Sequence, residues 1–397
     1  MSTPDPTVAL GRSPDELTLL GYQQLAKLTD RSIPSRRINF DFPLLGLFGE
    51  VGSLLAEVKK KQKDTDSYVG YEPAVLEELG DTLWYLANLA TRADLTLLEL
   101  AAYSESPVTQ AIEVTDRPFQ ALQPVFAARG PRPPDAFEAE LLRLAGRVGT
   151  LVAEVSGRTA PDRSLIAPLA SVFHSLIAVA NSAGVRLGGA AHENLQKTFG
   201  RWPVTRNYTP LFDEDFPPNE QLPRYIELAI SEELIDGKLC AVQRYKGANL
   251  GDPLTDNKKE EDDYRFHDCF HLAYAAVLGW SPNLRRLFRA KRKSVPSVDE
   301  AEDGARAILI EEGIATWIFN HASRLNFFES LNTIDYGLLK AVRNFIDGYE
   351  VDRCPLWMWE EAILKGYAVF RQLRQHRRGR VIADLTQRTI TFEEMPQ

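Results

Sequence analysis

The sequence predicts a mainly α-helical protein with a small β-sheet in its C-terminal part. Apolar residues recur at intervals of three and four through most of the first two hundred residues, as amphipathic helices require. These stretches are 17–28, 44–58, 75–90, 141–155 and 165–183. The pattern changes after residue 203, because residues 224–232 and 238–245 mix β-branched, aromatic and polar side chains. Asp236-Gly237 lies between these two segments and is typical of a hairpin turn.

Helices are expected again over roughly 262–378, and residues 381–392 alternate in polarity as a strand does. The proline-rich stretch at residues 106–134 has no clear helical or strand periodicity, which indicates a linker. We therefore expect four parts in this chain. They are a helical repeat at 1–105, a linker at 106–135, a second helical repeat at 136–205, and an α-rich domain with a small β-sheet at 206–397.

Composition and charge narrow the function classes. The chain has 397 residues, enough for two or three domains, and its 44% apolar and 25% charged residues are those of an ordinary globular protein. We expect no membrane span and no signal peptide, and the three separate cysteines without a CxxC pair fit a reducing cytoplasm. A net charge of −9 disfavours binding to duplex nucleic acid, which needs excess Lys and Arg.

Two segments of the chain resemble one another. Residues 49–58 and 146–155 are identical at seven of ten positions, and the helices that follow, 79–90 and 169–180, repeat more faintly. Chance similarity between two amphipathic helices is the alternative explanation. The second segment keeps the apolar positions but loses the acids: Arg147 stands for Glu50, Pro168 for Glu78, and Ser171 for Asp81.

Carboxylates gather on two consecutive helices of the first repeat. Glu50 and Glu57 share one helical face, and Glu78 and Asp81 share a face of the next helix. If the two helices pack antiparallel, the four acids converge and repel one another unless a cation offsets their charge. Mg²⁺ prefers such oxygen ligands and shares phosphate oxygens with a substrate. The alternative is that these acids form only the solvated stripe of amphipathic helices.

Other polar residues near these acids are candidates for substrate binding. Lys59, Lys60 and Lys63 follow the first acidic helix and are suited to contact phosphates, while Asn88 could contact a base or sugar or be an ordinary polar position. Trp84 could stack on a base, but large aromatic side chains at helical spacing are more often core residues.

These segments resemble the MazG-like all-α nucleoside triphosphate pyrophosphohydrolases. The resemblance is clearest over residues 17–100 and rests on Tyr22-Gln-Gln-Leu-Ala, Leu45-Gly-Leu-Phe-Gly-Glu-Val-Gly, Lys59-Lys60 and Glu77-Glu-Leu-Gly-Asp-Thr-Leu-Trp-Tyr-Leu. It implies Mg²⁺, or alternatively Mn²⁺, bound by an ExxE…ExxD signature, and cleavage of (d)NTP to (d)NMP and pyrophosphate. Glu50, Glu78 and Asp81 fall on three of the four signature acids.

The remaining signature acid, the second Glu of ExxE, is Ser53 here, a departure from the family pattern. Either Glu57 replaces the missing acid, or metal occupancy is reduced, or the domain binds nucleotide as a sensor without turnover. The resemblance continues weakly over 140–203, where Asn194, Lys197 and Arg201-Trp-Pro look like the segment that closes the nucleotide site in relatives. Because relatives form dimers or tetramers, we expect either a homodimer or a monomeric pseudo-dimer whose second repeat takes the partner's place.

A second possible metal site lies in the C-terminal part. Asp263, His267 and His271 are spaced four residues apart, and a later helix carries Glu311 and Glu312. Histidine and carboxylate ligands from two helices can form a metal centre and with it a second hydrolytic activity. The alternatives are a buried hydrogen-bonded network or a third, diverged copy of the pyrophosphohydrolase unit. The general-base Glu of HExxH zinc hydrolases is absent, because Asp268 follows the first histidine.

Overall fold

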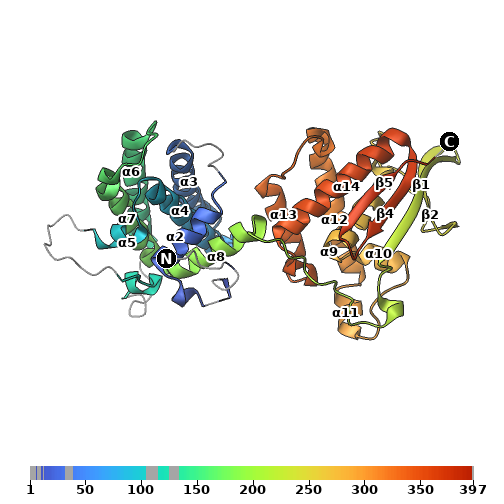
Figure 1. The fold of residues 1–397 in the computed structure, drawn as a ribbon, viewed down its shortest axis with the longest axis horizontal. Helices are drawn as coiled ribbons and strands as arrows, with labels where there is room; N and C mark the ends of the chain where they lie inside the picture. The colour runs from blue at the N-terminus through green and yellow to red at the C-terminus, as the bar shows by residue number, and fades with distance from the viewer. Residues whose placement is uncertain are drawn as a thin grey trace. The chain divides into compact units, whose positions relative to one another are not determined.

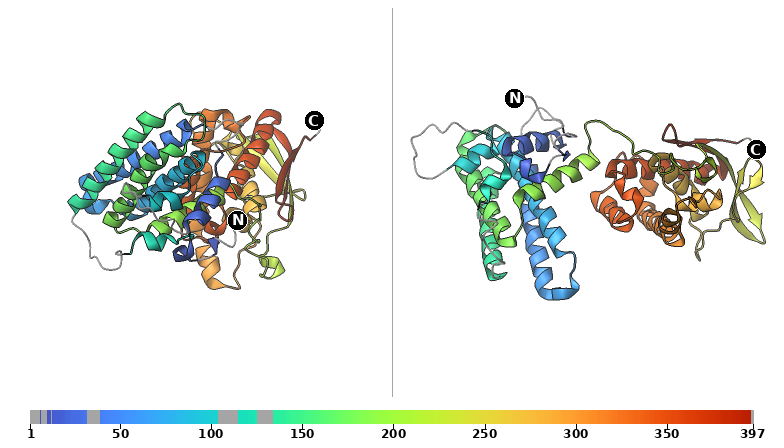
Figure 2. Two further views of the ribbon diagram at one scale, coloured as in Figure 1. Left: turned by 60° about the vertical axis from the view of Figure 1, so that its left-hand side comes forward. Right: turned by 90° about the horizontal axis from the view of Figure 1, so that it is seen from below.

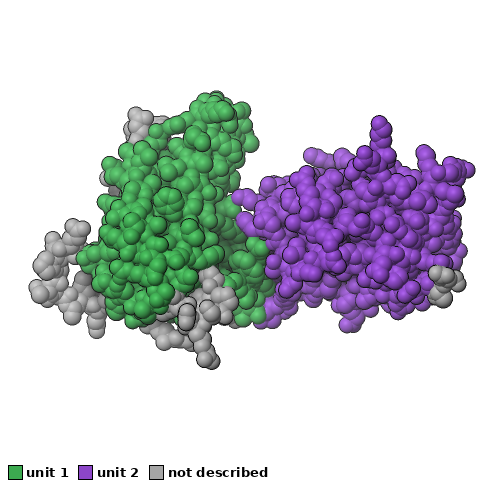
Figure 3. Space-filling model, turned by 90° about the horizontal axis from the view of Figure 1, so that it is seen from above, with its two compact units in different colours: residues 1–204 green, residues 205–397 purple. Residues whose placement is uncertain are grey.

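The computed structural model describes residues 13–31, 39–103, 115–124 and 134–395, with Pro6, Leu10 and Gly11 and without the side chains of Pro134 and Asp135. The chain divides into two compact units, Met1–Val204 and Thr205–Gln397, coloured separately in Figure 3. Most of the segment expected as a linker lies outside the described residues. Within it, residues 119–122 form a short 3-10 helix whose Phe119 is buried.

Unit 1 is built from helices (Figure 1). Its α-helices are α2 (Leu19–Leu28), α3 (Asp41–Asp64), α4 (Tyr71–Arg92), α5 (Leu97–Ala102), α6 (Pro134–Val155), α7 (Ile166–Ala183) and α8 (Leu187–Arg201). Short 3-10 helices lie at Pro14–Glu16, Thr65–Ser67, Phe119–Leu122 and Arg163–Leu165. The helical stretches expected from periodicity in the first two hundred residues are confirmed.

Two helix pairs share the core of unit 1. Helix α3 packs against both α4 and α6, and α7 packs against α6 and α4, as the long helices in Figure 2 show. The backbone N–H of Gly157 donates to Asp41 at 2.7 Å, so the end of α6 meets the start of α3 and these helices run antiparallel. The apolar faces of both pairs belong to one buried cluster. The packing on which the repeat hypothesis depends is therefore present.

One segment of unit 1 has the length and hydropathy of a membrane span. An 18-residue window within residues 163–183 has a mean hydropathy of 1.6, and half of that window is buried within the structure. A core helix passes the same test. Helix α7 lies within this segment and packs against α4, α5 and α6, which accounts for its apolar composition.

Unit 2 combines helices with one sheet. Its α-helices are α9 (Asp268–Leu278), α10 (Pro282–Leu287), α11 (Pro296–Ala301), α12 (Ala305–Ala322), α13 (Tyr336–Ile346) and α14 (Leu356–His376). Its strands are β1 (Tyr225–Ile235), β2 (Lys238–Tyr245), β3 (Ala248–Asn249), β4 (Arg378–Asp384) and β5 (Thr389–Glu393). Its 3-10 helices are Pro218–Glu220, Tyr264–Phe266, Ser323–Phe328 and Glu350–Arg353. The predicted fold class, mainly α with a small sheet, is confirmed.

The sheet is antiparallel, in the order β3-β2-β1-β4-β5. Strands β1 and β2 form the predicted hairpin, and both turn residues, Asp236 and Gly237, have positive φ (49° and 77°), as a type I′ turn requires. The C-terminal tail forms two strands where a single one was expected. Asp384 accepts backbone N–H bonds from Thr386 and Gln387 and so stabilises the turn between β4 and β5.

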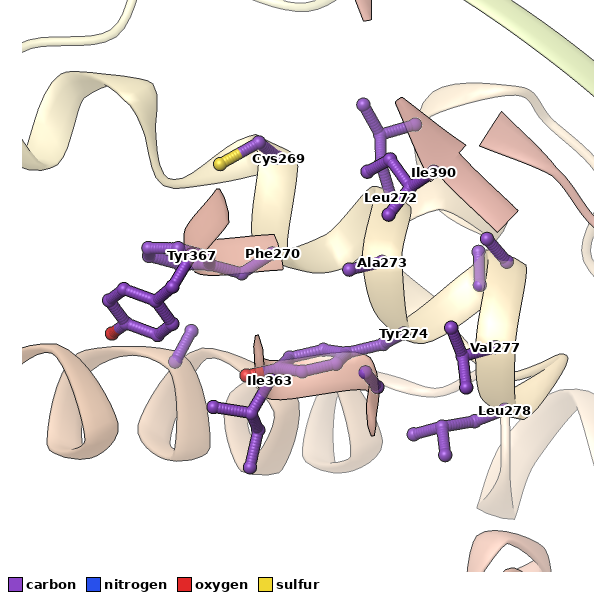
Figure 4. Packing of buried hydrophobic residues seen from close by; sticks show 14 of the residues in the cluster. Cys269, Phe270, Leu272, Ala273, Tyr274, Val277, Leu278, Ile363, Tyr367 and Ile390 are labelled. Atoms are coloured by element: carbon purple, nitrogen blue, oxygen red, sulfur yellow. The ribbon is translucent and has the colours of Figure 1, made fainter. Parts of the chain in front are cut away.

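Helix α9 lies at the centre of unit 2. Each of its residues is buried, and it packs against α14 on one side and against β4 and β5 on another. Figure 4 shows Phe270 and Tyr367 side by side in this core, with their ring centroids 4.4 Å apart. Gly366 permits the close approach, because a Cβ atom there would lie 3.0 Å from Cβ of Ala273. The polar side chains of α9 therefore lie within the hydrophobic core of unit 2.

Candidate active site

Helices α3 and α4 form an antiparallel hairpin that brings Glu50, Glu78 and Asp81 together. The side chains of Glu50 and Glu78 hydrogen-bond to each other across the hairpin, and the charge of Asp81 acts on both. One oxygen of Glu78, Oε2, is buried and has no hydrogen-bond partner. Three of the four acids that helical spacing predicted to converge therefore lie near one another, and Glu57 does not join them.

Burial and mutual repulsion change the ionisation of this pair. Burial, then the hydrogen bond and charge of Glu50, raises the pKa of Glu78 to about 8. Burial also raises the pKa of Glu50, assisted by the charges of Asp81 and Glu77. Near neutral pH the two carboxyl groups therefore share a proton, which is the expected result when carboxylates lie close together without a cation.

Helix α8 brings two further polar groups to Asp81. It crosses α4 closely at Gly80, where a Cβ atom would lie 2.6 Å from the carbonyl oxygen of Ala190. The amide of Asn194 donates to Asp81 Oδ1 at 2.8 Å and accepts from the hydroxyl of Tyr22 at 3.3 Å. Asn194 is 4% exposed, so this chain of hydrogen bonds fixes the orientation of the Asp81 carboxylate.

The ammonium group of Lys197 lies one turn beyond Asn194. It contacts both oxygens of Asp81 and lies 3.3 Å from Glu77 Oε1. Burial would lower the pKa of Lys197, but Asp81 and Glu77 outweigh it and the pKa is raised. Lys197 is therefore a charged partner that offsets part of the negative charge of the cluster.

The aromatic ring of Tyr85 lies near the carboxylates of Glu50 and Asp81. A Cβ atom at Gly46 of α3 would lie 2.2 Å from the Tyr85 ring, so this glycine gives the ring its place between the helices. Burial, then the charges of Glu50 and Asp81, raises the pKa of Tyr85 to about 12. Its hydroxyl is a neutral hydrogen-bonding group throughout the physiological range.

Glu57 and the lysines lie further along the hairpin, toward its loop. Glu57 is two turns from Glu50, about 10 Å along the axis, and it accepts from the Tyr68 hydroxyl and pairs with Lys60 at 3.7 Å. Lys60 also lies 3.9 Å from the centroid of the Tyr68 ring. Lys59 and Lys63 are exposed on α3. The structure thus separates Glu57 from the acids near Glu50.

Asn88 lies below the carboxylates in the core of unit 1. Its amide donates to the backbone oxygen of Trp84 at 2.9 Å, one turn earlier on α4, and it is 2% exposed. The Trp84 indole donates to the Thr29 hydroxyl at 2.9 Å. Trp84 is thus a core residue, as expected, and the buried Asn88 amide bonds to its backbone.

The second helix pair carries a different contact at the corresponding place. Arg147 of α6, which aligns with Glu50, donates to the backbone oxygen of Ser171 on α7 at 2.8 Å. Ser171 aligns with Asp81. A guanidinium-to-carbonyl hydrogen bond therefore joins this pair at the place where carboxylates face one another in α3 and α4.

In unit 2 the structure brings together three of the four residues of the second predicted site. His267, His271 and Glu312 lie close together, with Glu312 Oε1 3.5 Å from His271 Nε2. Asp263 does not join them and pairs with Arg374 and Arg377. The sequence interpretation assumed one helix from Asp263 onward, whereas α9 begins at Asp268 and Asp263 has a left-handed backbone (φ 69°). Asp268, rather than Asp263, lies beside the histidines.

The carboxylate cluster of unit 1 fits a hard divalent cation by its donor set. Its ligand atoms are carboxylate oxygens, which Mg²⁺ and Mn²⁺ prefer. The buried Glu78 Oε2 is an acceptor for which the described residues supply no donor. A cation held by Glu50, Glu78 and Asp81 would satisfy it and would remove the need for a shared proton.

Asn194 and Lys197 were absent from the site residues chosen from the sequence. Two signals were available: their resemblance to the closing segment of the family, and their spacing of three residues, which places both on the same face of a helix. That spacing does not reveal which helix they face. The contact with Asp81 depends on the crossing of α4 and α8 at Gly80, a tertiary feature.

Comparison with known proteins finds a family match for part of the chain. Residues 207–396, nearly all of unit 2, match the family described as the MazG C-terminal domain. This match supports a MazG-like protein. The Gene 37 protein of Mycobacterium phage L5 is 40% identical over 55 residues, which are 13% of this chain and 48% of that protein. The matched region thus spans about half the length of this relative. No solved structure matches the chain significantly.

Proposed function

We propose that this MazG-like protein is a Mg²⁺-dependent nucleoside triphosphate pyrophosphohydrolase that cleaves (d)NTP to (d)NMP and pyrophosphate. The observation that carries the proposal is the convergence of Glu50, Glu78 and Asp81 from two adjacent helices. The family match in unit 2 agrees with a nucleotide-related role but lies outside the helices that bear these acids.

The proposed reaction is attack of water on the α-phosphorus of the nucleotide. A new P–O bond forms to water, the bond from the α-phosphorus to the bridging oxygen breaks, and pyrophosphate leaves with its electron pair. Bound Mg²⁺ would neutralise phosphate charge and activate the water. Glu50, Glu78 and Asp81 would hold the ion, with Mn²⁺ as a substitute.

The polar groups around the acids would orient them. Asn194 would hold one Asp81 oxygen in place and leave the other to the ion. Lys197, now paired with Asp81 and Glu77, would move to a phosphate oxygen when the ion takes over its carboxylate partners. Lys59, Lys60 and Lys63 would meet the phosphates only if the substrate extends along α3 toward the loop.

The proposed catalytic assembly is a monomeric pseudo-dimer, with a homodimer as the alternative. Helices α6 and α7 pack on α3 and α4 in one core, where a second subunit's helix pair would otherwise be needed. Since Arg147 and Ser171 replace the acids there, each chain would have one active site.

A second candidate function is a nucleotide sensor without turnover. Ser53, in place of an expected acid, favours it, because fewer carboxylates hold the ion less tightly. In that case the output would lie in unit 2.

The test is pyrophosphate release by the full chain with each of the common NTPs and dNTPs in the presence of Mg²⁺. Activity that is lost in Asp81→Asn and retained in His267→Gln supports the proposal. The matched control Asp64→Asn alters an acid of α3 remote from Glu50. Tight nucleotide binding without release of pyrophosphate would replace the proposal with the sensor, and activity lost only in His267→Gln would place the hydrolysis in unit 2.

A further inference from the structure

Unit 2 holds a cluster of imidazole and carboxylate groups independent of the carboxylates in unit 1. His267 immediately precedes α9 with helical backbone angles, so His267 and His271 lie one turn apart on the same face. One ligand atom from each of His267, Asp268 and His271 can lie within 4.8 Å of the others. Helix α12 adds Glu312, whose oxygens lie 3.8 Å from His267 Nε2 and 3.5 Å from His271 Nε2.

The Nδ1 atom of each histidine already has a hydrogen-bond partner. Nδ1 of His267 lies 2.9 Å from the backbone oxygen of Tyr264, which can only accept, so Nδ1 carries the proton. Nδ1 of His271 lies 2.8 Å from Glu311 Oε1. In the neutral form of each ring with its proton on Nδ1, Nε2 presents a lone pair, and the Nε2 atoms lie 3.4–3.8 Å from carboxylate oxygens of Asp268 and Glu312.

A lone pair that faces a carboxylate oxygen is repelled unless a proton or a metal ion lies between them. The side chain of His271 is 1% exposed, and among the described residues its buried Nε2 has no hydrogen-bond partner within normal geometry. The gap from His267 Nε2 to Asp268 Oδ1 is 3.4 Å. Ligands about 2.1 Å from one ion, at angles between 90° and 110°, lie about 3.0–3.4 Å apart. The observed separations need only a small contraction to enclose an ion.

The surrounding groups hold these ligands in orientation. Glu311 is fully buried and accepts also from the Ser281 hydroxyl at 2.6 Å and from the backbone N–H of Asn283 at 2.9 Å. Asp268 Oδ2 accepts from the amide of Gln243 on β2, which leaves Oδ1 directed toward His267. Carboxylate or carbonyl partners on the distal nitrogen of a ligating histidine are the usual support of a metal site.

The negative charge of these carboxylates must be balanced, either by protons on the two histidines or by a bound cation. Asp268, Glu311 and Glu312 are three carboxylates in or beside a buried site, and among the described residues their ion pairs are with the two histidines alone. Lysine and arginine are absent from those pairs. Burying several carboxylates without a compensating charge is costly.

We propose that His267, His271, Asp268 and Glu312 form a binding site for one first-row divalent transition-metal ion, with Glu311 as a positioning residue. Two imidazole nitrogens and two carboxylate oxygens favour Zn²⁺, Mn²⁺, Fe²⁺ or Co²⁺ over Mg²⁺ or Ca²⁺, which prefer oxygen ligands. The Glu312 side chain is 37% exposed, so the ion borders solvent on that side and can keep a water ligand.

The test uses the full chain, stripped with chelator and titrated with Co²⁺ alone while the visible absorption is recorded. We expect about one equivalent of Co²⁺ with the d–d bands of imidazole ligation, displaced by Zn²⁺ but not by excess Mg²⁺. His267→Gln and Glu312→Gln should each weaken Co²⁺ binding by at least about tenfold. His321→Gln changes a histidine of α12 outside the cluster and should bind like the unaltered chain.

Two variants, Glu312→Gln and Glu78→Gln, keep the test decisive. Glu312→Gln alters a partly exposed side chain, so it decides the question if His267→Gln fails to fold by circular dichroism. Glu78→Gln removes a carboxylate from the unit 1 cluster and should leave the Co²⁺ bands unchanged. Absence of these bands in the unaltered chain, or their persistence in folded Glu312→Gln and His267→Gln, would show that the cluster is a hydrogen-bonded network and overturn the proposal.

Discussion

The carboxyl groups of Glu50 and Glu78 hydrogen-bond to each other across the α3–α4 hairpin, although both would be anions in water at neutral pH. Such a bond requires a proton between them, and the pKa of Glu78, raised to about 8 by burial and by Glu50, provides it. A divalent ion would take the place of this proton. Metal binding and proton release are therefore coupled at this site.

The coupling predicts a pH-dependent affinity for Mg²⁺. Between pH 6 and 8 the ion must displace the proton of Glu78, so affinity should rise with pH by up to about tenfold per unit. Calorimetry in two buffers of different ionisation enthalpy should report close to one proton released per ion at pH 7. Glu78→Gln should bind Mg²⁺ more weakly and without this proton release. An affinity that does not vary with pH would contradict the prediction.

Without metal, the same residue should make the hairpin less stable as pH rises. The folded pKa of Glu78, about 8, lies above its ordinary value of 4.5. Its contribution is therefore fully present below about pH 4.5 and is lost as pH rises through 8. Hydrogen exchange of α4 amides in chelator-treated protein, corrected for intrinsic rates, should show protection falling from pH 5 to 8. Glu78→Gln should flatten this trend, and saturating Mg²⁺ should reverse it.

Two glycine-to-alanine substitutions should have opposite effects. In Gly80→Ala the added Cβ would lie 2.6 Å from the Ala190 carbonyl oxygen, so α4 and α8 must separate, at a cost of about 1–3 kcal/mol. Separation also moves Asn194 and Lys197 away from Asp81, and pyrophosphate release should fall. In Gly52→Ala nothing lies within 4 Å of the new atom, and the exposed helix should gain about 0.5–1 kcal/mol. Chemical denaturation measures both; equal stabilities would refute the close crossing.

Helical period and spacing were sufficient to predict helices α2, α3, α4, α6 and α7 of unit 1 and the approach of Glu50, Glu78 and Asp81, but they wrongly added Glu57. Both depend on local pattern plus one antiparallel turn, and such features are encoded over short distances. The hairpin at Asp236-Gly237 was predictable for the same reason, because both residues adopt positive φ readily.

Features that depend on chain direction or distant packing were not predictable. Asp263 shares the four-residue spacing of the histidines, but the chain turns through a left-handed residue there, so the spacing does not imply a common face. Gln243 reaches Asp268 from a strand 25 residues earlier. Periodicity carries no information about such contacts, which arise only when the sheet and helices pack together.

Lys197→Met should tighten Mg²⁺ binding in the absence of nucleotide. The ammonium group contacts both Asp81 oxygens and so competes with an incoming ion for the same acceptors. Its removal should raise Mg²⁺ affinity several-fold, while the KM for nucleotide should also rise because a phosphate contact is lost. Lys63→Met, on the exposed end of α3, serves as control. An unchanged affinity in Lys197→Met would mean that Asp81 is not a ligand to the ion.

Ser53→Glu should restore the missing acid of the first helix. Ser53 is half-buried on α3 one turn from Glu50, so a longer acidic side chain there can reach the same ion. We expect Mg²⁺ affinity to rise by about tenfold, as one more carboxylate ligand strengthens binding, and pyrophosphate release to increase. Ser53→Gln adds similar bulk without charge and should do neither. If Ser53→Glu has no effect while Glu57→Gln abolishes release, then Glu57 must leave Tyr68 and Lys60 in the working enzyme and supply the ligand itself, which requires α3 to move relative to its loop.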